Sequence, residues 1–169
     1  MPSKGSKKVF VTVGTTEFDS LIKEVSSDPI CEILKSKGYT EVVLQIGRGT
    51  FEPIDRNEND FRLSHFRLKD SIIDEMLSAD LIISHAGAGS VLEALGAGKK
   101  LVVVINEELM GNHQTELAKE MSNQGYLFYS NIRKLNEVLR ESDFSKLITY
   151  KKGNPKVFSN CLDNIMGFS

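Results

Sequence analysis

The fold of this chain is decided by Leu81–Glu93, which reads Leu-Ile-Ile-Ser-His-Ala-Gly-Ala-Gly-Ser-Val-Leu-Glu. The apolar run at the start of this stretch is typical of a buried strand. From Val91 to Ala97, apolar residues recur at the spacing of one face of a helix. Gly87 and Gly89 lie between the two patterns. The stretch therefore predicts a strand, a glycine turn and a helix.

The predicted turn is a candidate anion site. Glycine lets the backbone come close to a ligand, and the free N–H groups at the start of a helix, together with its dipole, favour a negative group such as a phosphate. Glu93 lies about one turn into the helix, where its carboxylate can accept two hydrogen bonds from a vicinal diol such as a ribose. For the ring of His85 we favour a structural role. These features predict a nucleotide site that includes His85, Ala86, Gly87, Ala88, Gly89, Ser90 and Glu93.

Strands and helices alternate along the rest of the chain. The polar residues 50–60 are expected to form a surface loop. The alternation predicts an α/β fold, a Rossmann-like parallel sheet with helices on both faces. The expected strands are 9–13, 42–46, 61–68, 81–83, 101–105 and 126–129, and the expected helices are 18–34 with a break at Asp28-Pro29, 71–78, 91–97, 113–123 and 132–140.

Ligands of such sheets bind beyond the carboxyl ends of the strands, and three expected strands end there in glycine-containing turns. The turns are Gly14-Thr15-Thr16, Gly47-Arg48-Gly49 and the stretch His85–Ser90. Thr15 and Thr16 either cap the helix that follows or bind a diphosphate from its other side. Arg48 is either an ordinary exposed charge or a phosphate partner.

A further polar group, Asn112-His113-Gln114, opens the helix that follows the strand 101–105. Asn112 has the alternative role of a helix N-cap, and His113 that of a surface residue. Side-chain amides suit sugar hydroxyls because each offers donors and acceptors. With a nucleotide site nearby, we favour a sugar contact for Gln114.

A dinucleotide-binding domain is the alternative reading of the glycine turn. Its fingerprint requires glycine where Leu92 stands, although Glu107 and Glu108 lie roughly 20 residues on, where a ribose-binding acid is expected. The fingerprint normally follows the first strand of the sheet, and the first strand here is followed by Gly14-Thr15-Thr16. We therefore favour a different nucleotide ligand.

Composition limits the remaining possibilities. The chain has 169 residues, 40% of them hydrophobic, and a formal net charge of -2, which suits one compact domain and argues against nucleic acid as the main partner. No apolar run is long enough to cross a membrane, so we expect a cytoplasmic protein. No cluster has metal-ligand spacing, and no metal site is expected. Cys31 and Cys161, outside any Cys-x-x-Cys pattern, are expected to be buried and reduced.

The last residues differ from the rest of the chain. Residues 1–150 are predicted to form the nucleotide-binding domain, and residues 151–169 a linker followed by an amphipathic helix. This helix either packs on its own domain or docks on another protein.

Four motifs together resemble one family: Val11–Thr16, Gln45–Gly49, Ser84–Ser90 and Asn112-His113-Gln114. With them the chain resembles the cytosolic subunits of the two-part UDP-N-acetylglucosamine transferases of asparagine-linked glycosylation. These subunits are glycosyltransferase family 28-like and are similar to the C-terminal half of the bacterial lipid II GlcNAc transferase.

The resemblance implies the donor-binding half of a GT-B glycosyltransferase. It implies transfer of GlcNAc from UDP-GlcNAc to dolichyl-diphosphate-GlcNAc, inverting to a β1,4 bond, without a cofactor. Carried over by position, Glu93 would hold the ribose, the turn Gly87–Ser90 with Gly14-Thr15 the diphosphate, and Gln114 with Asn112 the GlcNAc. Uracil is expected near Phe66–Ile72.

The chain length implies a partner. A GT-B enzyme needs two Rossmann-like halves, and 169 residues supply one. The other half is therefore expected from another chain. The resemblance implies a heterodimer that is active only with a membrane-anchored, acceptor-binding subunit, which would also carry the general base, at the cytosolic face of the endoplasmic reticulum. The rival hypothesis is a regulatory module that binds a nucleotide sugar without catalysis.

Overall fold

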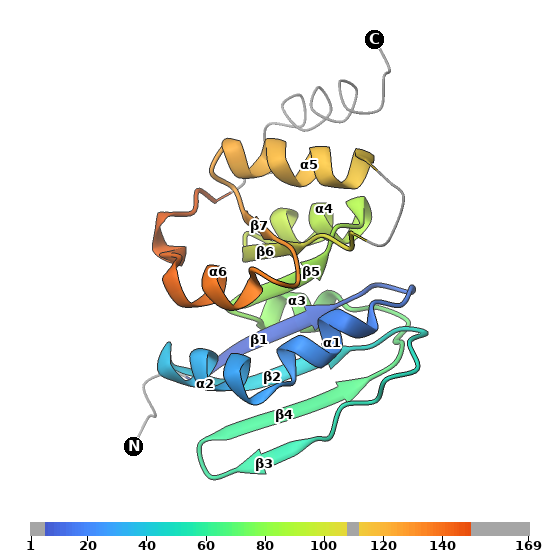
Figure 1. The fold of residues 1–169 in the computed structure, drawn as a ribbon, viewed down its shortest axis with the longest axis vertical. Coiled ribbons are helices and arrows are strands. Elements are labelled where there is room, and N and C mark those ends of the chain that lie inside the picture. The colour runs from blue at the N-terminus through green and yellow to red at the C-terminus, as the bar shows by residue number, and fades with distance from the viewer. Residues whose placement is uncertain (1–5, 108–111, 150–169) are drawn as a thin grey trace.

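The structure, a computed structural model, describes residues 6–107 and 112–149, which form one sheet between two layers of helices (Figure 1). The described sheet has seven strands in the order β3-β4-β2-β1-β5-β6-β7. Every neighbouring pair is parallel except β3 and β4. The predicted parallel sheet is therefore confirmed. The strands are β1 (Lys7–Thr12), β2 (Tyr39–Gln45), β3 (Arg56–Glu58), β4 (Phe61–Phe66), β5 (Leu81–His85), β6 (Lys100–Val104) and β7 (Phe128–Ser130).

The helices cover both faces of the sheet, as predicted. Alternate residues of β1 point to opposite faces, so Val9 and Val11 pack on one side and Phe10 on the other. The first side carries α1 (Asp19–Val25), α2 (Asp28–Ser36), α6 (Leu135–Glu141) and the short 3-10 helix η1 (Phe144–Lys146), and the second carries α3 (Ile73–Ser78), α4 (Ala88–Gly96) and α5 (Asn112–Asn123).

The break expected at Asp28-Pro29 divides the first helical region into α1 and α2. Pro29 lies at the start of α2, where its missing N–H costs no helical hydrogen bond. The helices turn their apolar residues to the sheet, and Leu21, Ile22, Ile30 and Leu34 are fully buried.

The prediction of a surface loop over residues 50–60 is wrong in part. Arg56–Glu58 forms β3, an edge strand paired antiparallel with β4. Pro53 is buried and Phe51 is half-buried against the main core. The three residues of β3 are polar, so no apolar pattern in the sequence predicts this strand. It forms because it pairs with β4.

The glycine turn after β5 is also shorter than predicted. Helix α4 begins at Ala88 with Gly87 at its N-cap, so Gly89 is a helical residue. The helix therefore starts directly beside the end of the strand.

Cys31 is fully buried, as predicted, and its thiol donates a hydrogen bond to the carbonyl of Val25 over 3.6 Å. Burial raises the pKa of this thiol. Cys161 and the predicted linker and helix of residues 151–169 lie outside the described residues. Within the described ranges, no helix has the length and apolar character needed to cross a membrane.

Candidate functional site

A cavity of about 420 Å³ lies at the carboxyl edge of the sheet, where β1 and β5 end. From β1 the chain continues to β2 and β4 on one side, whereas β5 and β6 lie on the other side. The cavity is thus at the point where the strand order reverses, which is where open α/β sheets bind their ligands. Its lining comes from Gly14, Thr15, Thr16, Gln45, Lys69, Asp70, Ser71, Ile72, His85, Gly87, Gly89, Ser90 and Glu93.

The start of α4 forms one wall of this cavity. The first helical hydrogen bond runs from the N–H of Val91 to the carbonyl of Gly87, over 3.0 Å. The N–H groups of Ala88, Gly89 and Ser90 precede that bond and point out of the helix end. The first turn of α4 has no acidic residue, so no carboxylate of this turn neutralises the positive end of the helix dipole. This wall is suited to an anion.

His85, at the end of β5, packs its ring between two turns. A Cβ on Gly14 would lie 2.9 Å from the ring Nε2, and a Cβ on Gly87 would collide with the ring. The Nε2 atom lies 3.4 Å from the hydroxyl oxygen of Ser90. Burial lowers the pKa of this histidine, so the imidazole is neutral at pH 7. The ring joins the turn after β1 to the start of α4.

The turn after β1 is held from within the sheet. The hydroxyl of Thr12 donates to the side-chain carbonyl of Gln45 and accepts from the N–H of Gly14, the latter over 2.9 Å. The hydroxyl of Thr16 donates to the carbonyl of Val13. Helix α1 starts at Asp19 with Phe18 at its N-cap, so neither threonine caps it. Thr15 and Thr16 are exposed and line the cavity.

The cation at the cavity differs from the predicted one. Arg48 is exposed and is absent from the residues that line the cavity, although its backbone N–H donates to the carbonyl of Thr16 over 2.9 Å. Lys69, in the loop between β4 and α3, lines the cavity instead. Sequence reasoning gave neither Lys69 nor Gln45 a role of its own, although they lie in the segment Phe66–Ile72 and the motif Gln45–Gly49. Gln45 carried a signal, because it is the polar residue in the otherwise apolar run Val42–Ile46.

Glu93, in the second turn of α4, is exposed and lines the cavity together with Gly89 and Ser90. Ala86 is buried beneath α4 and Ala88 is exposed. Ile72, in the segment expected to meet uracil, also lines the cavity.

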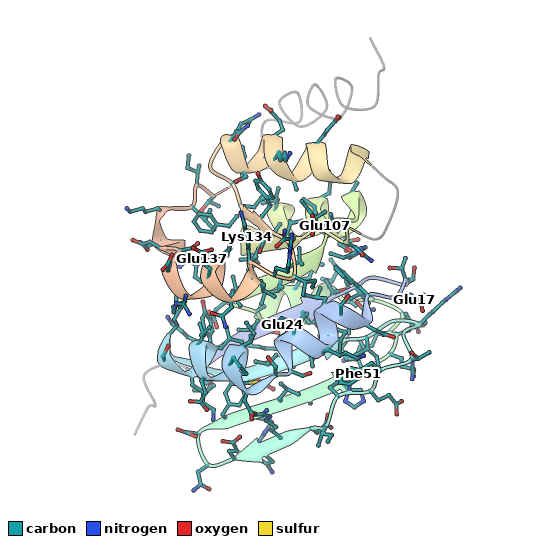
Figure 2. The ribbon with its side chains drawn as sticks, viewed as in Figure 1. Glu17, Glu24, Phe51, Glu107, Lys134 and Glu137 are labelled. Carbon is teal, nitrogen blue, oxygen red and sulfur yellow. The ribbon has the colours of Figure 1, made fainter. Side chains whose placement is uncertain are left out.

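The remaining candidates are described only in part. The backbone of Asn112, His113 and Gln114 opens α5, and their side chains lie outside the described part of the structure. Glu107 is exposed and is not among the lining residues, and Glu108 falls outside the described ranges (Figure 2). In those ranges, no three His, Cys, Asp or Glu side chains gather where they could hold a metal ion.

Residues 8–160 match the glycosyltransferase family 28 C-terminal domain, and these residues include all of the cavity lining. The chain belongs to this family. It is 52% identical over 130 residues to the UDP-N-acetylglucosamine transferase subunit ALG13 of Mus musculus, an alignment that covers 77% of this chain and 11% of that protein. It is 33% identical to the subunit ALG13 of Kluyveromyces lactis, covering 93% of this chain and 96% of that protein.

Solved structures share the fold of this chain. An NMR structure of ALG13 has 26% sequence identity and a TM-score of 0.72, and the match covers 95% of this chain and 98% of that chain. The crystal structure of Acinetobacter baumannii MurG, at 18% identity and a TM-score of 0.68, has the same fold over 98% of this chain and 51% of its own. The predicted resemblance and fold are confirmed.

Proposed function

We propose that this chain is the donor-binding subunit of a UDP-GlcNAc transferase that acts on dolichyl-diphosphate-GlcNAc. The observation that carries the proposal is the cavity at the carboxyl edge of the sheet, where the amide end of α4 and the carboxylate of Glu93 line one space. An anion and a diol are the two groups that a nucleoside diphosphate presents together. The names of the similar ALG13 proteins support GlcNAc as the sugar.

Each part of the donor has a proposed place. The ribose hydroxyls bind Glu93, and the diphosphate binds the backbone of Gly87–Ser90 and Gly14-Thr15. All of these residues except Ala88 line the same cavity. Uracil lies beside the segment that ends at Ile72. Gln114 and Asn112, at the start of α5, bind the GlcNAc.

The proposed reaction is a single inverting displacement. The O4 hydroxyl of the acceptor GlcNAc attacks C1 of the donor sugar, the bond from C1 to the diphosphate oxygen breaks, and UDP leaves with that electron pair. The proton of O4 passes to a general base on the partner. The N–H groups of α4 stabilise the charge on the leaving diphosphate, which needs no metal ion. A β1,4 bond results.

A membrane-anchored partner completes the proposed enzyme. This chain matches about half of the MurG chain, which supports one Rossmann-like half per chain. The proposed acceptor is a lipid, and no described helix is long and apolar enough to cross a bilayer. In this proposal the partner supplies the acceptor half at the cytosolic face of the endoplasmic reticulum, and this chain alone is inactive.

Donor binding is tested with the full chain by titration with UDP, UDP-GlcNAc and NAD. The substitution Glu93→Ala is expected to weaken binding of UDP by about 1.5–3 kcal/mol, because a charged hydrogen-bond acceptor is lost. Glu137→Ala is the matched control, since Glu137 is an exposed helical glutamate on α6, away from the cavity lining (Figure 2). Equal affinities of the two variants, or tighter binding of NAD than of UDP, contradict the assignment of Glu93.

Catalysis is tested by co-expression with a membrane partner recovered by pull-down. The complex, supplied with UDP-GlcNAc and a dolichyl-diphosphate-GlcNAc acceptor, is expected to form the chitobiose-linked lipid, and this chain alone is not. An inactive complex that still binds the donor would support the regulatory module instead.

A further inference from the structure

Lys69 stands apart from the other residues of the cavity because of its charge. Among the described residues that line the cavity, it is the only lysine or arginine. The neutral imidazole of His85 adds no positive charge at pH 7. The groups that can attract a bound diphosphate are therefore the amides of α4 and one ammonium group, in a lining that also includes the acids Asp70 and Glu93.

The place of this ammonium group is determined by two contacts. The Nζ atom of Lys69 donates to Oε1 of Glu75 over 2.8 Å and lies 4.4 Å from the ring centroid of Phe66. The Phe66 ring is itself stacked on Phe10, with the centroids 6.3 Å apart. Phe10 is fully buried, so the pair of stacked rings that Lys69 contacts is anchored in the core.

Glu75 does not cancel the charge of Lys69. Its other oxygen accepts from Nζ of Lys8 over 2.9 Å, so one carboxylate serves two ammonium groups and the trio keeps a net positive charge. Burial raises the pKa of the Glu75 carboxyl, but hydrogen bonds from Lys69 and Lys8 outweigh it and leave the pKa lowered. Glu75 is thus ionised at pH 7.

Lys69 also retains donors for a ligand. An ammonium group has three donors, and the bond to Glu75 uses one of them. The side chain is 46% exposed, whereas that of Glu75 is 16% exposed, so the lysine is the accessible member of the pair. A cation held in place by a partly buried partner such as Glu75 loses less conformational freedom when it binds an anion.

We propose that Lys69 is the side-chain cation that binds the diphosphate of the donor. This inference rests on the proposed function and assigns the charge that the sequence had suggested for Arg48. When the sugar is transferred, the leaving diphosphate gains negative charge, and an ammonium group beside it stabilises that charge. Lys69 is therefore a specificity residue for phosphate in the donor.

The test compares UDP with uridine, which lacks the phosphates. The full chain and the variants Lys69→Met and Lys69→Arg are titrated with both compounds by calorimetry. Lys69→Met removes the charge and keeps an unbranched side chain. We expect it to weaken binding of UDP by about tenfold, as for one lost charged hydrogen bond, and to leave uridine affinity within about twofold. Lys69→Arg is expected to restore most of the UDP affinity.

The matched control is Lys119→Met, because Lys119 is an exposed lysine of α5 that does not line the cavity. Its affinities for both compounds are expected to equal those of the unchanged chain. Equal weakening of UDP and uridine by Lys69→Met would overturn the inference, because Lys69 would then act on the nucleoside or on the fold. Unchanged UDP affinity would overturn it as well.

The same titrations distinguish a failure of the proposed function from a failure of the role of Lys69. If the unchanged chain binds UDP no better than uridine, both the proposed diphosphate site and the inference fail. If the unchanged chain prefers UDP and Lys69→Met retains that preference, only the role of Lys69 fails.

Discussion

The two glycine turns Gly47–Gly49 and Gly87–Gly89 have the same Gly-x-Gly pattern and lie at the same edge of the sheet, but their surroundings differ. In the first turn, a Cβ on Gly47 would collide with the carbonyl oxygen of Thr16, and a Cβ on Gly49 would collide with the carboxylate of Asp19. In the second turn, a Cβ on Gly89 would meet no atom within 4 Å. The first turn is closed by the protein itself at both glycines. The second turn is open towards the cavity at Gly89 only, because a Cβ on Gly87 would collide with the ring of His85.

The comparison separates two uses of glycine. In the closed turn, the missing side chain makes room for the neighbouring turn after β1, whose Thr16 carbonyl accepts the N–H of Arg48. In the open turn, the missing side chain of Gly89 leaves space in front of the N–H groups of α4. Loss of Gly47 or Gly49 should therefore cost stability, and loss of Gly89 should cost ligand affinity.

The largest effect is expected from Gly47→Ala. Gly47 has a φ of +61°, which disfavours any L side chain, and the added methyl group would press on the carbonyl of Thr16. We expect the free energy of unfolding to fall by about 3 kcal/mol. Urea unfolding measures this change as a lower midpoint. A midpoint equal to that of the unchanged chain would mean that the turn is not closed as described.

The next largest effect is expected at Asp19, whose side chain closes the same turn. The carboxylate of Asp19 accepts hydrogen bonds from the hydroxyl and the N–H of Thr50, over 2.9 and 3.2 Å. Burial raises the pKa of Asp19, but the bonds from Thr50 outweigh it and leave the pKa lowered. Asp19→Ala is expected to lower the free energy of unfolding at pH 7 by about 1–2 kcal/mol.

Asp74→Ala is the control for Asp19→Ala. Asp74 is also an acid in the first turn of a helix, α3, but it is exposed. Urea unfolding measures the free energy of unfolding of both variants. If it falls by a similar amount in both, Asp19 stabilises the protein only through its interaction with the helix dipole.

In the open turn, Gly89→Ala is expected to raise the stability of the protein and to weaken its binding of UDP. Alanine suits an exposed helical position better than glycine, so the free energy of unfolding should rise by about 0.5 kcal/mol. The methyl group would stand in the space before the first amides of α4, and UDP affinity should fall by about tenfold. Thermal unfolding and calorimetric titration measure the two changes. Lower stability with unchanged affinity would reverse the comparison between the turns.

The smallest effect concerns the pH dependence of stability. Because burial lowers the pKa of His85, the unfolded chain takes up this proton more readily than the folded chain below about pH 6.5. The free energy of unfolding should therefore fall as the pH drops from 7 to 5. In His85→Gln, the part of this fall that is due to His85 should be absent. The lowered carboxyl pKa values of Asp19 and Glu75 change the stability only at pH values below the usual carboxyl pKa values of 3.8 and 4.5. Parallel pH profiles would show that His85 is not buried as described.

Most of the sheet could be predicted because its central strands are continuous apolar runs. β3 could not, since Arg56–Glu58 is polar and only its pairing with β4 makes it a strand. The position of Gly89 inside α4 could not be predicted either, because two glycines near a helix start suggest a longer turn.

The candidate site could be predicted where it depends on strand ends. Gly14 lies just after β1, His85 ends β5 and Ser90 lies in the first turn of α4, and β1 and β5 are neighbours in the sheet. Lys69 depends on the path of the loop between β4 and α3 and on its bond to Glu75, which local sequence does not reveal. Arg48 has the right position in the sequence, but its side chain stays outside the cavity lining.

The central place of β1 has a consequence for biosynthesis. Val9 pairs with Val42 on one side and with Leu81 on the other, so the two edges of one strand are completed at very different times as a nascent chain leaves the ribosome. Until β5 is synthesised, one edge of β1 stays open to solvent and to other chains. Such long-range parallel pairing slows folding, and early intermediates of this protein should depend on chaperones more than its finished form.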